Sequence, residues 1–453
     1  MTFQSINPYS QRRLKTYRAD SPTAIERKLK QAEQAFTDWS ELSLAERTVY
    51  LRRVGEYLTT HKQSLGELIT AEMGKTRKEA VGEVEKCAAA CTFYADHANT
   101  FLADEVVQTD GQRSFVTYQP LGPVLAIMPW NFPYWQVFRF AIPGLLAGNV
   151  GLLKHAPNVF GCALAIEDIF RQCGLPNGVF QSLLIDVAPV EGLLKDRRVR
   201  AVTLTGSGQA GSSVAGIAGR EIKKSVLELG GSDALIVLAD ADLERAAETA
   251  VKSRMQNAGQ SCIAAKRFIV EKGVKKQFTE LVLHHIGQIS QGDPTDDAVT
   301  MGPMARLDLA DAIETQCRES VAQGAKLVTG DFRRNGCNVQ SMLLDRVRPG
   351  MAAFDQETFG PLATLIEAKN EDDAIRLANQ SDFGLGSALW TSDLDRADRL
   401  VRQIQAGSVF VNGLMRSDVR VPFGGIKNSG FGRELSDIGM KEFVNVKTVW
   451  MES

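Results

Sequence analysis

Long apolar runs are absent from this chain of 453 residues, and so is a strong charge of either sign. The most apolar stretch, RFAIPGLLAGNVGLLKHAP, is interrupted by Pro143 and by glycines and ends in charge, so it cannot span a bilayer. The N-terminal MTFQSINPYSQRRLKTYRAD lacks the apolar core of a secretory signal. The formal net charge of -2 gives no reason to expect nucleic acid or an anionic membrane as a partner.

Paired cysteines are also missing. The seven cysteines are an odd number and are scattered along the chain. This distribution is typical of neither a disulfide framework nor a zinc site, so we expect no bound metal. Free thiols suit a reducing compartment, and we therefore expect a cytoplasmic protein.

What the chain does contain is a regular alternation of elements, over a length that predicts two or more domains. Between residues 21 and 101, apolar residues recur at three- and four-residue spacing, which predicts helices. Short apolar runs then alternate with helix-like sequence, the pattern of a doubly wound parallel sheet. These runs are PVLAIMP, NVGLLKH, GVFQSLLI and AVTLTG.

The alternation restarts after Glu228, with DALIVL, the helical DLERAAETAVKSRMQ and then KRFIVE. No internal repeat, low-complexity stretch or long linker separates the two units, so they should pack closely with any cleft between them. We predict an α/β fold of two doubly wound parallel-sheet domains.

A glycine-rich turn ends one of the predicted strands. In AVTLTGSGQAG, Gly206, Gly208 and Gly211 satisfy the G-x-G-x-x-G pattern of a dinucleotide-binding helix N-terminus. Glu228 lies near the distance at which that pattern places a ribose-binding acid. The following segment is short and glycine-rich for a crossover helix, however, so a plain strand-to-helix turn remains an alternative.

One cysteine stands out from the others. The segment QNAGQSCIAAKR, Gln256–Arg267, places Cys262 among small and polar residues. No histidine lies near it in the sequence, although thiol nucleophiles often use one as a base. Taken alone, Cys262 is either a buried inert thiol or a nucleophile whose base comes from elsewhere in the chain.

Six motifs together give a family resemblance. In their order and spacing they resemble the NAD(P)-dependent aldehyde dehydrogenase superfamily over essentially the whole chain, and the sequence is most similar to its succinate-semialdehyde dehydrogenases. The motifs are PWNFP (Pro129–Pro133), LTGS (Leu204–Ser207), LELGG (Leu227–Gly231), NAGQSC (Asn257–Cys262), ETFGP (Glu357–Pro361) and PFGGIKNSGFGRE (Pro422–Glu434).

The resemblance implies a Rossmann-like cofactor domain, a catalytic domain and a small β extension used in oligomerisation. The implied boundaries are 1–104 and 121–229 for the NAD(P)-binding domain, 230–429 for the catalytic domain, and 105–120 with 430–453 for the extension. The extension would pair across a subunit boundary and give a homodimer or homotetramer. From sequence alone, KEFVNVKTVWMES could equally be an ordinary edge strand.

The resemblance also implies a covalent mechanism. Cys262 would attack an aldehyde as the thiolate, and the Asn131 amide with the Cys262 backbone N–H would stabilise the oxyanion. Hydride would pass to the nicotinamide, and Glu228 would activate the water that hydrolyses the thioester. Alternatively, Asn131 is a turn residue before Phe132, and Glu228 is a ribose ligand or an exposed strand-end carboxylate.

For the cofactor, one departure from the family pattern is informative. NAD-preferring relatives commonly carry a glutamate three residues after Lys154, and this chain has Pro157 there. Without that carboxylate, Lys154 and His155 would tolerate or favour a 2′-phosphate, so we predict NADP, with NAD accepted less well; alternatively, Pro157 only shapes its loop. The cofactor-binding residues implied are Trp130, Lys154, His155, Pro157, Gly206, Ser207, Gly211, Leu229, Glu357 and Phe359.

For the substrate, Arg139 is the informative residue. It lies eight positions after Asn131 in the apolar run YWQVFRFAIPGLLAG, a place at which the succinate-semialdehyde dehydrogenases carry an arginine. Its guanidinium could hold a carboxylate far from the aldehyde, or it could form an internal salt bridge. A second arginine of many relatives is replaced by Gln256, and Arg416, Ser417 or Arg420 could substitute for it.

The resemblance therefore implies oxidation of succinate semialdehyde to succinate, with another small aldehyde as the alternative. Three other classes stay open on the residues: a dinucleotide-independent thiol hydrolase, a non-catalytic binding protein on the same scaffold, and an acyl-transferring enzyme that uses coenzyme A.

Overall fold

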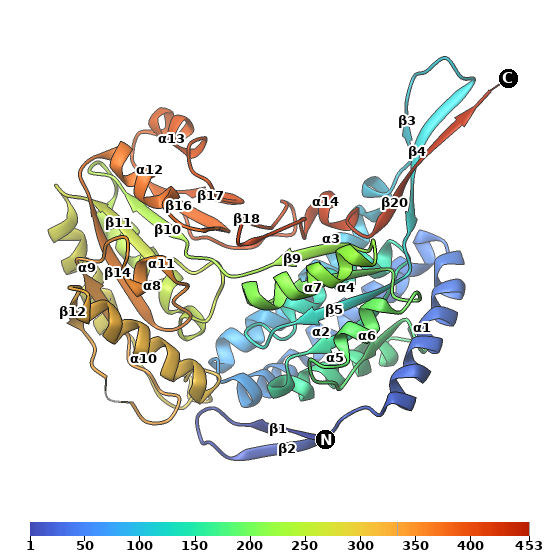
Figure 1. Cartoon of the computed structure of the whole chain (residues 1–453), viewed down its shortest axis with the longest axis horizontal. Helices are drawn as coiled ribbons and strands as arrows, with labels where there is room; N and C mark the ends of the chain where they lie inside the picture. Colours follow the sequence, from blue (N-terminus) through green and yellow to red (C-terminus); the bar gives the residue numbers. More distant parts are fainter. Residues whose placement is uncertain (333, 453) are drawn as a thin grey trace.

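The computed structural model describes residues 1–332 and 334–452 as two α/β lobes that lie side by side (Figure 1). The first lobe contains the N-terminal half of the chain, and the second contains most of the C-terminal half. An arm of antiparallel strands projects from the first lobe and ends at the C-terminus. The predicted α/β class with two parallel sheets is confirmed.

The first lobe is built on a six-stranded sheet of order β19-β9-β8-β5-β6-β7. All its pairs are parallel except β19 with β9. Because the strands from β5 to β9 are parallel, the segments that follow β5, β8 and β9 meet at one edge of the sheet. The strands are β5 (Pro123–Met128), β6 (Val150–His155), β7 (Phe180–Ser182), β8 (Ala201–Thr205), β9 (Lys224–Glu228) and β19 (Gly430–Phe431).

Helices cover both faces of this sheet, and the predicted helical region between residues 21 and 101 is confirmed as α1, α2 and α3. Capping boxes fix the starts of α2 and α3, each with a hydroxyl paired to a glutamate three residues on. The glycine-rich segment, although short, is the crossover helix α7. The helices are α1 (Pro22–Glu41), α2 (Leu44–Met73), α3 (Arg77–Phe101), α4 (Trp135–Leu146), η1 (Pro157–Val159), α5 (Phe160–Gln172), α6 (Val190–Lys195) and α7 (Gly208–Arg220).

The second lobe contains a seven-stranded sheet of order β12-β13-β14-β11-β10-β16-β17, parallel except for β12. Its strands are β10 (Ala234–Val237), β11 (Arg267–Glu271), β12 (Lys326–Thr329), β13 (Met342–Asp345), β14 (Leu362–Ala368), β16 (Gly386–Trp390) and β17 (Ser408–Val411). Its helices are α8 (Leu243–Met255), η2 (Gln256–Gly259), α9 (Lys275–Gly287), α10 (Leu307–Ala322), α11 (Ala352–Asp355), α12 (Glu371–Asn379) and α13 (Leu394–Val401).

The arm is a three-stranded antiparallel sheet in which β20 pairs with β4 along its full length. The two predicted extension segments thus lie together, although Gly430–Phe431 of the second joins the six-stranded sheet as β19. The exact boundaries of the NAD(P)-binding domain, the catalytic domain and the extension stay a prediction. The remaining elements are β1 (Thr2–Ile6), β2 (Arg13–Arg18), β3 (Glu105–Val106), β4 (Arg113–Pro120), β15 (Phe383–Gly384), β18 (Ile426–Lys427), α14 (Ser436–Met440) and β20 (Val444–Met451).

The described helices of this fold are those of neither a membrane span nor a metal site. Among residues 1–332 and 334–452, no helix is long and apolar enough to cross a membrane. Within the same residues, no group of three or more histidine, cysteine or acidic side chains is arranged to hold a metal ion.

Candidate active site

The segment before Cys262 is a tight left-handed turn. Asn257 and Ala258 have φ values of 55° and 51°, and Gly259 has 73°. A Cβ atom at Gly259 would lie 2.2 Å from the carbonyl oxygen of Gly360, so only glycine fits there. The turn ends α8 and directs Cys262 into the region between the two lobes.

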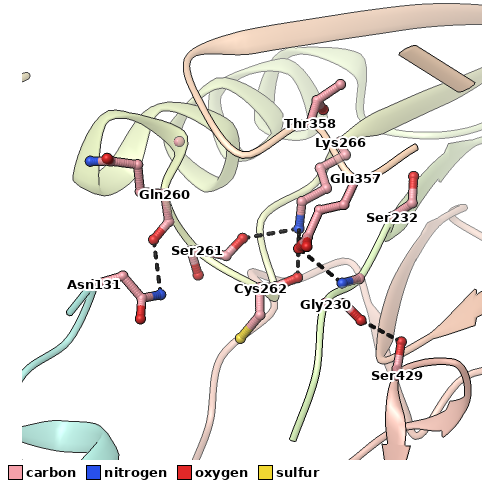
Figure 2. Close-up of polar contacts among 12 residues, drawn as sticks. Asn131, Gly230, Ser232, Gln260, Ser261, Cys262, Lys266, Glu357, Thr358 and Ser429 are labelled. Carbon is pink, nitrogen blue, oxygen red and sulfur yellow. Dashed lines mark hydrogen bonds and ion pairs between the residues drawn. The ribbon is translucent and has the colours of Figure 1, made fainter. Parts of the chain in front are cut away.

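Lys266 holds the loop that carries Cys262 (Figure 2). Its ammonium donates to the backbone carbonyls of Ser261, at 3.0 Å, and Cys262, at 2.6 Å, and forms an ion pair with Glu357 at 3.4 Å. The Cys262 sulfur points away from Lys266. The sequence analysis missed Lys266; its signal was a lysine placed directly before the buried strand β11.

Two cavities meet at Cys262. The α3–α4 cavity, of about 350 Å³, is lined by Lys86, Trp135 and Arg139 among others. The α7 cavity, of about 390 Å³, is lined by residues such as Gly206 and Glu357. Cys262 and Gln136 line both cavities, so the thiol lies on their shared wall.

The Cys262 thiol is neutral at pH 7 in this state. Burial raises its pKa from 9.0 to about 11, while the positive charges of Arg139 and Lys266 act to lower it. The carboxylates of Glu228 and Glu357 contribute to this upward shift of the Cys262 pKa. A nucleophilic role therefore needs a base or a more positive environment when the site is filled.

Asn131 lies beside the cysteine loop. Its side-chain Nδ2 donates to the Gln260 backbone carbonyl at 3.1 Å (Figure 2), and its backbone carbonyl accepts from Asn257 Nδ2 at 2.9 Å. Asn131 also lines the α7 cavity together with Cys262. This position is compatible with an oxyanion donor, a role that stays a prediction.

Glu228, at the end of β9, is buried, which rules out the alternative of an exposed carboxylate. Burial raises its pKa well above 4.5, Glu434 raises it further, and Arg139 lowers it. Its Oε1 lies 2.8 Å from where a Cβ at Gly424 would be. Glu228 is not among the described residues that line either cavity, and its role as a general base stays a prediction.

Arg139 forms the internal ion pair that the sequence left open as an alternative. Its Nε lies 2.7 Å from Glu434 Oε2, and both side chains are buried. The guanidinium still lines the α3–α4 cavity, and its Nη2 has no hydrogen-bond acceptor among the residues that the structure describes. Arg139 can therefore meet Glu434 and an anion in the cavity at the same time.

The two other predicted substrate residues differ in position. Gln256 lines the α3–α4 cavity, together with Arg416 and Ser417. Arg420 is exposed, pairs with Asp418 at 2.6 Å and is not among the described residues lining either cavity, so nothing in the structure supports its predicted contact with substrate.

Six of the predicted cofactor residues line the α7 cavity. Trp130 and Phe359 face each other edge to face, with ring centroids 5.8 Å apart. Ser207 caps α7 by accepting from the Ala210 N–H at 3.3 Å, which leaves a helix N-terminus open to a phosphate. This arrangement fits a dinucleotide. The six residues are Trp130, Gly206, Ser207, Leu229, Glu357 and Phe359.

The other four are not among the described residues that line this cavity: Lys154, His155, Pro157 and Gly211. The ring nitrogens of His155 contact the carbonyls of Met128 and Pro133, and burial lowers its pKa to about 4, so His155 adds no positive charge near neutral pH, and its predicted cofactor contact stays a prediction. Gly211 instead packs against Leu229, because a Cβ atom at Gly211 would lie only 2.6 Å from the leucine side chain.

Glu83 is a further residue that the sequence analysis missed. Its carboxylate accepts the backbone N–H groups of Tyr134, at 2.8 Å, and Trp135, at 3.0 Å, and pairs with Lys75 at 2.5 Å. It therefore fixes the start of α4, the helix that carries Arg139.

Comparisons with known proteins agree with this geometry. The model of the aldehyde dehydrogenase family matches residues 1–449. The chain is 48% identical to a probable succinate-semialdehyde dehydrogenase (NADP(+)) of Synechocystis sp. over 100% of both chains, and 45% identical to a succinate semialdehyde dehydrogenase (NAD(P)+) of Escherichia coli over 99% of this chain and 97% of that one.

A solved structure is similar over the whole fold. The crystal structure of succinic semialdehyde dehydrogenase from Streptococcus pyogenes with NADP+ has a TM-score of 0.97 and 34% identity, and covers 100% of both chains. With two cavities meeting at one cysteine and a family match over nearly the whole chain, this protein belongs to the aldehyde dehydrogenase family.

Proposed function

We propose that this protein oxidises succinate semialdehyde to succinate with NADP+. The observation that carries the proposal is the position of Cys262 on the wall shared by two cavities. One cavity contains a helix N-terminus suited to a pyrophosphate, and the lining of the other includes the cationic side chains of Lys86, Arg139 and Arg416 as well as Glu79 and Glu83. The names of the relatives from Synechocystis sp. and Streptococcus pyogenes support both the substrate and the cofactor.

The chemistry follows from the residue types. The Cys262 thiolate adds to the aldehyde carbon, and the new oxyanion is stabilised by the Asn131 amide and the Cys262 backbone N–H. A nicotinamide held in the α7 cavity would supply the hydride acceptor, and this oxidation would leave a thioester on Cys262. Glu228, as the carboxylate, takes a proton from water as the water attacks the thioester, and succinate and the thiol are released.

Cofactor preference is proposed from the segment after β6. Pro157 stands where NAD-preferring relatives commonly carry a glutamate, so no carboxylate repels a 2′-phosphate there. Lys154 supplies the positive charge, although burial lowers its pKa. His155, being neutral, adds none.

We also propose a cytoplasmic homo-oligomer, a dimer or a tetramer. The arm formed by β4 and β20 leaves Val446, Trp450 and Met451 exposed. Apolar side chains gathered on a projecting sheet are typical of a contact with a second subunit.

A panel of aldehydes and cofactors tests the proposal. We expect kcat/KM for succinate semialdehyde to exceed that for butanal, which has the same chain length and no carboxylate, by at least about tenfold. We expect NADP+ to be preferred to NAD+ in the same assay. Equal kcat/KM values for the two aldehydes, or a preference for NAD+, would contradict the substrate or the cofactor assignment. A thiol hydrolase would form no NADPH at all.

Replacing Arg139 with alanine should lower kcat/KM for succinate semialdehyde by roughly 10- to 100-fold, because a charged hydrogen bond to the substrate is lost. It should also lower kcat for butanal, since the buried Glu434 loses its ion-pair partner and the pKa of Glu228 rises further. Steady-state kinetics with both aldehydes measure the two effects, and Arg139→Lys serves as the charge-conserving comparison. Unchanged kcat/KM for succinate semialdehyde would refute a substrate contact.

A further inference from the structure

Lys86, on α3, is a cation without an acidic partner in the α3–α4 cavity. Its Nζ donates to Ser417 Oγ at 2.7 Å and lies 4.2 Å from the centre of the Trp135 ring. Within residues 1–332 and 334–452, no carboxylate forms an ion pair with it. The side chain is partly buried and lines the same cavity as Cys262.

Ser417 has one hydrogen-bonding group left over. Its Oγ accepts from Lys86 Nζ and, at 3.0 Å, from Trp135 Nε1, and these two bonds use both of its lone pairs. No described residue accepts the Ser417 O–H, although the side chain is buried. A buried donor of this kind needs an acceptor, which a ligand in the cavity can supply.

The acids around Lys86 are already engaged. Glu83 pairs with Lys75 at 2.5 Å, and Glu434 pairs with Arg139 at 2.7 Å. Asp418, on the neighbouring loop, pairs with Arg420 at 2.6 Å.

Glu79 accepts the Asn257 N–H at 2.7 Å and caps its own helix. On the cationic side, Arg139 from α4 and the exposed Arg416 also line the cavity. Each nearby carboxylate is already bonded to another group, so Lys86 has no direct ion-pair partner among the described residues.

We propose that Lys86 is the second cation, beside Arg139, that binds the distal carboxylate of the substrate, next to Ser417, which the sequence already suggested as an anchor. This inference rests on the proposed function, because it assumes an aldehyde with a carboxylate. It explains why the cavity can accept such an anion even though Gln256 occupies a position at which many relatives have an arginine. The ammonium and the hydroxyl can each bond one carboxylate oxygen.

The protonation of Lys86 gives the subsite a pH dependence. Burial and, to a smaller extent, the charge of Arg139 lower the Lys86 pKa to about 8, with Glu83 and Asp418 partly opposing the shift. Lys86 is charged below this pKa and neutral above it. The ratio of kcat/KM for succinate semialdehyde to kcat/KM for butanal should therefore fall as the pH rises through about 8. Taking the ratio cancels the titration of Cys262, which is common to both aldehydes.

The test is Lys86→Met, compared with Lys86→Arg and with Lys78→Met, an exposed lysine on the same helix. In Lys86→Met the ratio should fall by roughly 10- to 100-fold, mainly through KM for succinate semialdehyde. In Lys86→Arg most of the ratio should return, and its decline near pH 8 should disappear because guanidinium does not titrate there. Lys78→Met should keep the ratio and its pH profile.

The outcomes separate this inference from the proposed function. If the unaltered enzyme shows a ratio near one, the proposed substrate fails before any variant is made. If the unaltered enzyme prefers succinate semialdehyde but Lys86→Met keeps its ratio, or loses both activities equally, the subsite assignment alone is wrong. If Lys86→Met does not fold, two other measurements test the assignment: the ratio of kcat/KM values in Ser417→Ala, and the pH dependence of that ratio in the unaltered enzyme. A ratio that Ser417→Ala leaves unchanged and that does not vary with pH overturns the assignment.

Discussion

Replacing Cys262 with alanine is expected to abolish NADPH formation, lowering kcat by at least about 10⁴-fold. The reason is that the thiolate is the proposed atom bonded to the substrate carbon, and no other described cysteine lines either cavity. The dissociation constant of NADP+, measured by fluorescence titration, should change by less than about threefold, because the α7 cavity is formed mainly by other residues.

The matched control is Cys173→Ala, at the end of α5 and outside both cavities. Its turnover should stay close to that of the unaltered enzyme. Substantial NADPH formation by Cys262→Ala would refute covalent catalysis through this residue. A second signature is available, since the thiol pKa of about 11 means that alkylation by iodoacetamide should accelerate about tenfold per pH unit between pH 7 and 9.

The second large effect is expected for Glu228→Gln. Loss of the general base should lower steady-state kcat by roughly 10²- to 10⁴-fold, with NADP+ affinity largely kept. If Glu228 acts on the hydrolytic water, the first turnover still occurs, and a rapid burst of NADPH equal to the concentration of active sites should precede the slow phase. Rapid-mixing measurements of NADPH absorbance test this directly.

The control is Glu167→Gln, which changes another carboxyl group whose pKa burial raises, located on α5 and outside both cavities. Full turnover in Glu228→Gln, combined with weak NADP+ binding, would instead identify Glu228 as a ribose ligand. An absent burst would mean that Glu228 also activates the thiol.

The pH profile of the unaltered enzyme follows from the same carboxyl group. Burial and the neighbouring Glu434 hold the pKa of Glu228 well above its ordinary value, and a base must be deprotonated to act. Deacylation should therefore slow as the pH falls through this raised pKa. Glu228 is not among the described residues that line either cavity, so we expect its side chain to rotate toward Cys262 when the thioester forms.

The sequence by itself determined the α/β class, the helical region from residue 21 to 101 and the segments that surround Cys262. These features are readable because hydrophobic periodicity and glycine placement are local properties of the chain. The G-x-G-x-x-G turn was correctly located for the same reason, since its strand, turn and helix follow one another directly.

Only the tertiary structure decided which charges are available at the site. In the folded chain Arg139 forms an ion pair with Glu434, His155 is buried and neutral, and Arg420 is exposed beside Asp418. The tertiary structure also brought Lys86 to Cys262 from a helix far away in the sequence. The physical reason is that burial and ion pairing depend on which segments pack together, so the charge state of a side chain in a cleft follows from neighbours that no local pattern names.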